Sequence, residues 1–204
     1  MRDLPHWNGT QRIRADESTS GVLVTTHPDD NLVCETTPWP PPELLQKYYA
    51  SARFRGRTTE DDAGARAGLG HYCDLQSLNS EDAVTWSFFG NVVYANPKER
   101  LEVFNRLLEN IGDSAVSDAP ICWLWRRLPH PEKAESSGGP EIDFGFLSNS
   151  TLVLGEAKWN SPLGTGQGVN GDRTQLYLRA RYCDLYATLA LKSVRRFIVL
   201  GVGR

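Results

Sequence analysis

The sequence predicts an α/β fold organised around two adjacent strands. Residues 140–146 and 152–159 are short apolar runs with aromatic and β-branched residues, and Pro, Ser, Asn or Gly bounds each of them. A pattern with clear helix start and stop signals precedes this pair, and a helix pattern and a last apolar run follow it. The chain has 204 residues, of which 40% are hydrophobic, and this is enough for one domain with a core of its own.

Residues 1–79 are expected to form an N-terminal arm, a helix and a loop-rich extension. Residues 1 to about 40 are rich in Thr, Asp, Pro and Asn and show little periodicity, so they predict a loosely ordered arm with one strand at 21–25. A Pro-rich run then opens a helix that extends from Glu43 to about Arg53. Four glycines punctuate residues 53–78, which favours a loop there.

The second part of the chain, residues 80–204, is expected to be the core, and it opens on a helix. Ser80 is a natural N-cap, and Glu81 and Asp82 follow it at the positive end of the helix dipole. The stripe expected to face the core consists of Val84, Phe88 and Phe89, with Trp86 at its border.

Further elements follow in order. A second helix is expected from the cap Asn96 to about Asn110, and a strand from Ile121 to Arg126, in which core packing of the tryptophans is favoured over base stacking. After the strand pair, Asp172 is expected to cap a long helix over residues 173–191, and residues 195–203 form the last strand.

Three charged residues lie within the central strand pair, where an unpaired ion would cost several kcal/mol. Glu156 and Lys158 are two residues apart, so they share a face of the sheet. A connecting loop with an even number of residues, or a bulge, would place Asp143 opposite Glu156 on that face. A three-residue loop would instead place it opposite Gly155, and we expect the even loop or the bulge.

Two carboxylates and an ammonium group at a sheet edge suit a site for Mg²⁺, which prefers oxygen ligands and completes its shell with water and substrate phosphate. Lys158 could then orient or deprotonate a water molecule, or offset charge on a phosphoryl oxygen. The alternative is an exposed hairpin with a surface ion pair worth about 0 to 1 kcal/mol. The neighbouring Leu152, Leu154 and Phe144 favour burial and therefore the site.

At these residues the chain resembles the PD-(D/E)xK nuclease superfamily, which has the restriction-endonuclease-like fold. The motif is Asp143 on one strand and Glu156-Ala157-Lys158 on the next. The resemblance covers residues 80–203 and implies a mixed central sheet flanked by helices in the order αβββαβ. It implies a hydrolase, a metal-dependent nuclease that cleaves phosphodiester bonds, with a DNA endonuclease as the first expectation and RNA as an alternative substrate.

The resemblance also implies roles for single residues. Asp143 and Glu156 would bind Mg²⁺, or Mn²⁺ in its place, with the backbone carbonyl of Ala157 as a further ligand, and Lys158 would assist the attacking water. Gln175 would complete the catalytic set, as in branches with a Gln-x-x-x-Tyr pattern, although this chain has Arg179 where that pattern has Tyr. Glu81 matches a metal ligand of many members, and complementing the helix dipole is an equally good account of it.

Charge and composition set the expected partners. The net charge of −3 argues against general binding of nucleic acid, yet basic residues cluster locally, and Arg126, Arg127 and Arg179 are candidates for phosphate contacts. For Arg179 a solvated helix face is an equal alternative. The four cysteines complete no zinc spacing, and no signal peptide or membrane span is recognisable, so a cytoplasmic protein is expected. A two-fold homodimer would suit double-strand cleavage, and the competing function is an inactive nuclease-fold module that binds nucleic acid or protein.

Overall fold

The computed structural model describes residues 2–6, 9–17, 21–26, 28–32, 36–37, 39–50, 74–131, 141–158 and 173–203. The chain divides into two compact units, Met1–Asn91 and Val92–Arg204. The boundary expected between residues 79 and 80 falls inside the first unit. Of the loop expected at 53–78, residues 53–73 lie outside the described residues, as does the cap expected at Asp172.

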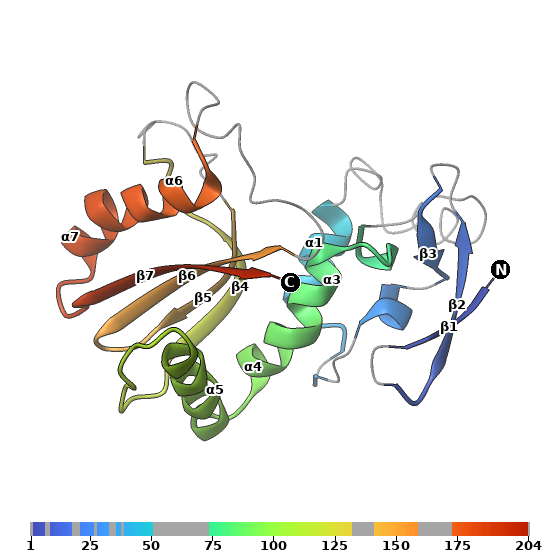
Figure 1. The fold of residues 1–204 in the computed structure, drawn as a ribbon, viewed down its shortest axis with the longest axis horizontal. Coiled ribbons are helices and arrows are strands. Elements are labelled where there is room, and N and C mark those ends of the chain that lie inside the picture. Colours follow the sequence, from blue (N-terminus) through green and yellow to red (C-terminus); the bar gives the residue numbers. More distant parts are fainter. Residues whose placement is uncertain are drawn as a thin grey trace. The chain divides into compact units, whose positions relative to one another are not determined.

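The first unit contains a three-stranded antiparallel sheet with strand order β1-β2-β3 (Figure 1). Its strands are β1 (Arg2–Pro5), β2 (Arg12–Glu17) and β3 (Leu23–Thr25). The strand expected at 21–25 is confirmed as β3, whereas the loosely ordered arm is wrong for β1 and β2. In β2 only Ile13 and Ala15 are buried, between exposed charged residues. Two apolar positions are too short a pattern to predict a strand with a buried face.

Two buried amide side chains tie the turns of this unit to each other and to the sheet. Asn31, at the end of the 3₁₀ turn η1 (Pro28–Asn31), donates from Nδ2 to the carbonyls of Leu75 and Ser77 at 2.8 and 2.7 Å. Gln76, in the 3₁₀ turn η2 (Asp74–Gln76), donates from Nε2 to the carbonyl of Thr25 at 2.8 Å. Because buried polar groups are costly unless bonded, these contacts fix the turns specifically.

The helices of the first unit begin with α1 (Pro42–Ala50), in agreement with the expected start near Glu43. The predicted cap at Ser80 is confirmed, because its side chain accepts a hydrogen bond from the backbone N–H of Ala83 at the start of α3 (Glu81–Thr85). The chain continues into a π-helical turn, η3 (Trp86–Gly90), and then α4 (Asn91–Tyr94).

The π-helical turn reverses part of the expected core pattern. Trp86 is fully buried and Phe88 is 62% exposed, so the expectation of a buried Phe88 with Trp86 at the border was wrong. Phe89 is buried, as expected. A π-turn has more residues than an α-turn, and a stripe counted at the α-helical period loses its phase there.

The second unit has the helix and strand order αβββαβ (Figure 1). After α4, its elements are α5 (Pro97–Asn110), β4 (Ile121–Arg127), β5 (Glu141–Leu147), β6 (Thr151–Lys158), α6 (Gln175–Tyr182), the π-turn η4 (Cys183–Ala187), α7 (Thr188–Ala190) and β7 (Arg196–Gly203). The strand order is β4-β5-β6-β7, in which β4, β5 and β6 are antiparallel and β7 runs parallel to β6. The predicted α/β class with a mixed sheet flanked by helices is therefore confirmed.

Helix α5 covers one face of this sheet, and α6 covers the other (Figure 1). On the α5 side, Phe104 stacks on Phe146 with 5.1 Å between the ring centroids. On the α6 side, Leu152 and Leu154 pack with Cys183 of η4 and with other apolar residues. The side chains of β6 therefore alternate as the sequence predicts, and residues 152, 154, 156 and 158 face α6.

The N-terminal ends of α5 and α6 are fixed by polar side chains. The expected cap at Asn96 is confirmed, and it forms a capping box with Glu99. Thr174 caps α6 by accepting a hydrogen bond from the N–H of Tyr177 at 3.1 Å. None of the described helices is long and apolar enough to cross a membrane.

Candidate functional site

The hairpin between β5 and β6 has the even loop that the sequence analysis predicts. The N–H of Ser148 donates to the carbonyl of Thr151 at 2.9 Å, which leaves Asn149 and Ser150 as a two-residue loop. The ladder then runs from Leu147↔Leu152 to Phe144↔Gly155. Gly155 is required there, because a Cβ atom would collide with the ring of Phe144. The next residues along the two strands are Asp143 and Glu156.

The regular pleat of β5 breaks at Asp143. Ile142 packs on the α6 side with Leu154, whereas Phe146 packs on the α5 side, although regular alternation would place both residues on one face. On the neighbouring strand, β4 pairs through Leu124↔Phe144 and Arg126↔Ile142, and Trp125 between them has a φ of 51°. The distortion involves both β4 and β5 and lies at Asp143, the candidate metal ligand.

The side chain of Asp143 accepts a hydrogen bond that a backbone carbonyl would accept in a regular ladder. Its Oδ2 accepts a hydrogen bond from the N–H of Ala157 at 2.8 Å, beyond the last pair of the β5–β6 ladder. The carboxylate is thereby held against β6, next to Glu156. A carboxylate that accepts a backbone N–H is oriented more firmly than one on a solvated surface.

Glu156 is the most deeply buried acid of the cluster, with 1% of its side chain exposed. Its Oε1 lies 3.0 Å from Nζ of Lys158, so the prediction that these two residues share a face is confirmed. Its Oε2 accepts a hydrogen bond from Nη2 of Arg179 on α6. The side chain of Lys158 is 18% exposed and lies at the end of β6. Glu156 therefore has one cation partner at the edge and one in the interior.

Arg179 is fully buried, so the solvated helix face, one of the two alternatives for this residue, is wrong. Besides Glu156, its Nη2 contacts the carbonyl of Glu141 at 2.8 Å. Burial lowers the pKa of the guanidinium, and the charges of Glu156 and Asp143 oppose this shift. An arginine in a protein nevertheless stays protonated. Because Arg179 is buried beside Glu156, a phosphate would have to enter the cluster to contact it. A contact between Arg179 and a substrate phosphate stays a prediction.

Arg179 was the main residue whose role the sequence analysis did not find. It precedes the buried Cys183 by four residues, which places both on one face of the helix. This spacing could have indicated a buried arginine, and a buried arginine requires an acidic partner. Its Nε and Nη1 have no hydrogen-bond partner within the described part of the chain. Buried donors of this kind are normally bonded to other protein groups or to ordered water.

The formal charges of the cluster cancel. Asp143 and Glu156 carry two negative charges, and Lys158 and Arg179 carry two positive ones. The oxygen donors are of the type that Mg²⁺ prefers, and Asp143 and Glu156 come from neighbouring strands. The described residues contain no group of three His, Cys, Asp or Glu that could hold a metal ion. An ion held here would have two carboxylate ligands and would complete its shell with backbone, water or substrate oxygens.

The other predicted residues of the second unit lie around this cluster. Gln175 is the first residue of α6, one turn before Arg179, and the described residues give it no hydrogen bond to either carboxylate. The guanidinium of Arg126 lies 5.3 Å from the ring centroid of Trp123, and Arg127 pairs with Glu141 at 3.8 Å. Both arginines are at the end of β4, an edge strand of the sheet. Contacts of these three residues with a substrate stay predictions.

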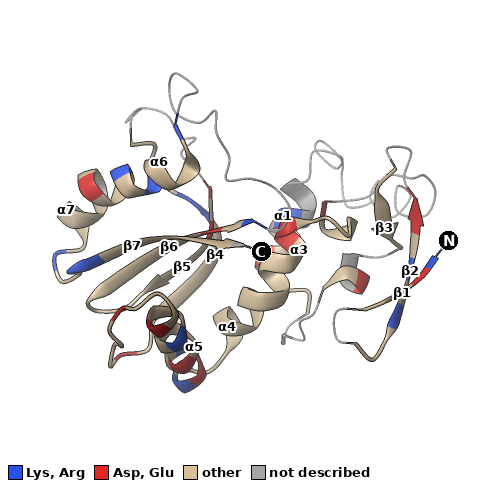
Figure 2. Cartoon of the chain, in the orientation of Figure 1, with Lys and Arg blue, Asp and Glu red and all other residues tan. Residues whose placement is uncertain are grey.

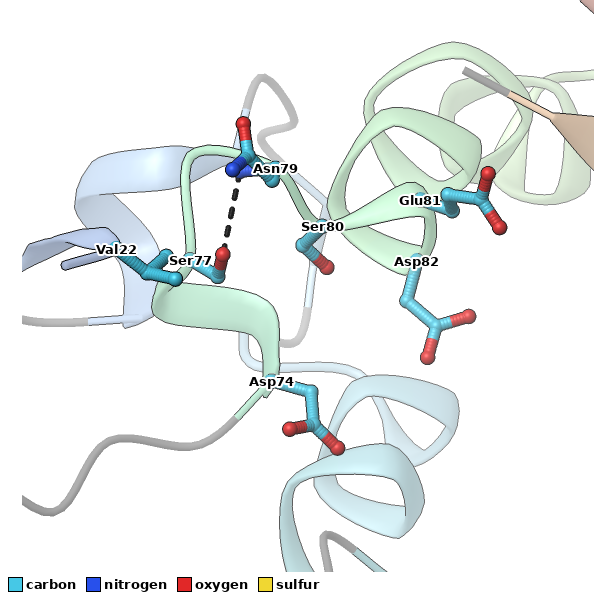
Figure 3. A pocket seen from close by; sticks show the side chains of 7 residues that line it. All are labelled: Val22, Asp74, Ser77, Asn79, Ser80, Glu81 and Asp82. Carbon is cyan, nitrogen blue, oxygen red and sulfur yellow. Dashed lines mark hydrogen bonds between the residues drawn. The ribbon is translucent and has the colours of Figure 1, made fainter. Parts of the chain in front are cut away.

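Glu81 belongs to the first unit and lines a pocket of about 340 Å³ there (Figure 3). Asp74 and Asp82 also line this pocket, and Asp82 pairs with Lys47 of α1 at 3.1 Å. Ser77 accepts a hydrogen bond from the N–H of Asn79 at the rim, which is the dashed line in Figure 3. Glu81 stands in the first turn after the cap Ser80, as the dipole account requires, and its role as a metal ligand stays a prediction.

Basic and acidic residues are interspersed along α5, whereas α6 carries two arginines and no acid (Figure 2). The described elements therefore carry charges of both signs. Comparisons of the chain with protein-family models, curated proteins and solved structures gave no match.

Proposed function

We propose that the chain is a metal-dependent nuclease with a restriction-endonuclease-like core, and that it hydrolyses phosphodiester bonds in DNA. The observation that carries the proposal is the placement of Asp143 against β6 beside Glu156 and Lys158. The carboxylate of Asp143 is tied to Ala157, the residue between the other two. A purely structural hairpin has no need of two acids and a lysine at one point of a sheet, because burying them is costly.

Each residue of the cluster has a distinct task in this proposal. Asp143 and Glu156 would hold Mg²⁺ with the carbonyl of Ala157, and the ion, when bound, supplies charge neutralisation at the phosphate and a lower pKa for water. Lys158, at the more exposed end of the cluster, orients the attacking water or donates a hydrogen bond to a phosphate oxygen. Arg179 fixes the Glu156 carboxylate from the interior.

The first test is cleavage of supercoiled plasmid, linear duplex, single-stranded DNA and RNA in Mg²⁺, Mn²⁺ or EDTA. Asp143→Asn keeps an oxygen for the Ala157 N–H, so it should preserve the fold and lower cleavage by at least about 100-fold. Lys158→Met should lower the cleavage rate by about 10² to 10⁴-fold. Matched controls are Glu102→Gln and Lys98→Met on the exposed side of α5, which should cleave like the parent chain.

A second candidate function is a nuclease-fold module that binds nucleic acid or protein without cleaving it. The observation in its favour is that both oxygens of Glu156 already have cationic partners, so the cluster is neutral without a metal. The same assay separates the two functions. If Mg²⁺ and Mn²⁺ support no cleavage of any of the four substrates by the parent chain, the nuclease proposal fails and the binding module stands.

A further inference from the structure

The contacts of Glu156 bear on how many metal ions the site can take, and this question rests on the proposed function. A pair of divalent ions would need several carboxylate oxygens to bridge or flank them. Here Oε2 of Glu156 accepts a hydrogen bond from Nη2 of Arg179, which also donates to the carbonyl of Glu141. The side chain of Arg179 is fully buried, so it does not exchange with solvent as an exposed cation does. One cation of the cluster is therefore permanent.

Lys158 differs from Arg179 in this respect. Its ammonium bonds the other oxygen of Glu156 from the end of β6, with part of the side chain exposed to solvent. A lysine carries its charge on a flexible stem, whereas Nη2 of the buried Arg179 donates both to Glu156 and to the carbonyl of Glu141. The oxygen bonded to Lys158 is thus the one that an incoming ion can take.

We propose that Arg179 is a positioning residue that fills the place of a second metal ion, and that the site binds a single divalent cation in exchange for Lys158 at Glu156. The fixed guanidinium aims the carboxylate, and the incoming cation displaces the ammonium from Oε1. Lys158 is then released toward the substrate, where the proposed reaction needs it. Metal binding at Glu156 and the release of Lys158 are therefore coupled.

Mn²⁺ provides the probe, since it can be counted by titration calorimetry and by electron paramagnetic resonance without any cleavage. The full-length chain is expected to bind one Mn²⁺ with the spectrum of an isolated ion. Lys158→Met removes the competitor for Oε1 and should bind Mn²⁺ at least about tenfold more tightly, while cleavage is lost. Asp143→Asn removes a ligand and should weaken binding, and Lys98→Met on α5 should leave it unchanged.

Arg179→Lys provides the test of the positioning residue. It keeps the charge, so one Mn²⁺ per chain is still expected, but a single ammonium holds the carboxylate less firmly, and the affinity should fall severalfold. Circular dichroism of each variant establishes that it is folded before metal is added, and the parent chain and Lys158→Met decide the matter if Arg179→Lys does not fold.

The outcomes separate this inference from the nuclease proposal. Two spin-coupled Mn²⁺ per chain, with cleavage, would overturn the single-ion site and leave the nuclease standing. Unchanged or weaker Mn²⁺ binding in Lys158→Met would overturn the exchange, whatever the cleavage result. Absence of both Mn²⁺ binding and cleavage in the parent chain would contradict the nuclease proposal and the single-ion site together.

Discussion

Glu156 and Arg179 form an ion pair in which the side chains are 1% and 0% exposed. Removing two charges from water costs several kcal/mol each, and their attraction offsets this only while both partners are present. Loss of one partner leaves an uncompensated charge in the interior. The pair is therefore a point where a single substitution acts on stability and on the site together.

Glu156→Leu should lower the free energy of unfolding by about 3–5 kcal/mol, because Arg179 stays buried without its acid. Adding Arg179→Met should restore most of that loss, since two apolar residues of similar volume can replace a buried pair. Urea unfolding followed by circular dichroism measures both. The control is the exposed pair Glu102 and Arg106, where Leu and Met should change stability by less than about 1 kcal/mol. A double variant as unstable as Glu156→Leu alone would contradict the account.

At the scale of elements, a polar contact ties the end of α5 to the start of β7. Arg196 donates from Nη1 to Oδ1 of Asp113 at 2.8 Å and to the carbonyl of Ser114 at 2.7 Å. The N–H of Ser114 also bonds Oδ1 of Asp113. This backbone bond and the Arg196 guanidinium hold the pKa of Asp113 below its ordinary value of 3.8. The helix on one face of the sheet is thus fastened to the parallel strand.

This contact makes a pH-dependent contribution whose sign follows from the lowered pKa. The ionised carboxylate is favoured in the folded state, so the stabilisation is complete above pH 3.8 and is lost as pH falls through the lower folded pKa. Asp113→Asn should therefore lower the melting temperature at pH 7, and the difference from the parent chain should shrink toward pH 3. Glu109→Gln, at an exposed position of α5, is the control. A difference that does not change with pH would show that Asp113 acts by another route.

At the scale of the whole molecule, the second unit has a core of its own. Phe104 and Leu108 of α5, Phe144 and Phe146 of β5, and Val153 of β6 are nearly or fully buried, and all belong to Val92–Arg204. The proposed catalytic residues Asp143, Glu156 and Lys158 belong to the same unit. The second unit therefore contains both a set of buried apolar residues and the candidate site.

A fragment of residues 92–204 should accordingly fold by itself and unfold in one cooperative transition in urea. Far-UV circular dichroism and proton–nitrogen correlation spectra of the fragment measure this against the full chain. If the fragment also binds Mn²⁺ like the full chain, Glu81 is not needed as a ligand. A fragment without a cooperative transition would show that the first unit contributes to the core of the second.

The local patterns of the sequence predicted most elements of residues 80–204. The caps at Ser80 and Asn96, the strand pair and the even loop between β5 and β6 are confirmed, because each depends on residues close together in the chain. Where the backbone leaves its regular period, the same reasoning failed. In the π-turn at Trp86–Gly90, Trp86 is buried and Phe88 is exposed, contrary to expectation. A helical period of 3.6 residues does not predict this change.

By itself the sequence determined the class of fold, through the order of its helix and strand patterns, and the shared face of Glu156 and Lys158, through strand alternation. Only the tertiary structure decided that Arg179 is the inner partner of Glu156 and that the Asp143 side chain replaces a ladder bond at Ala157. Arg179 is 23 residues from Glu156 in the chain, and its partner depends on how α6 lies across the sheet. The charge balance of the site therefore appears only when the helix is packed on the sheet.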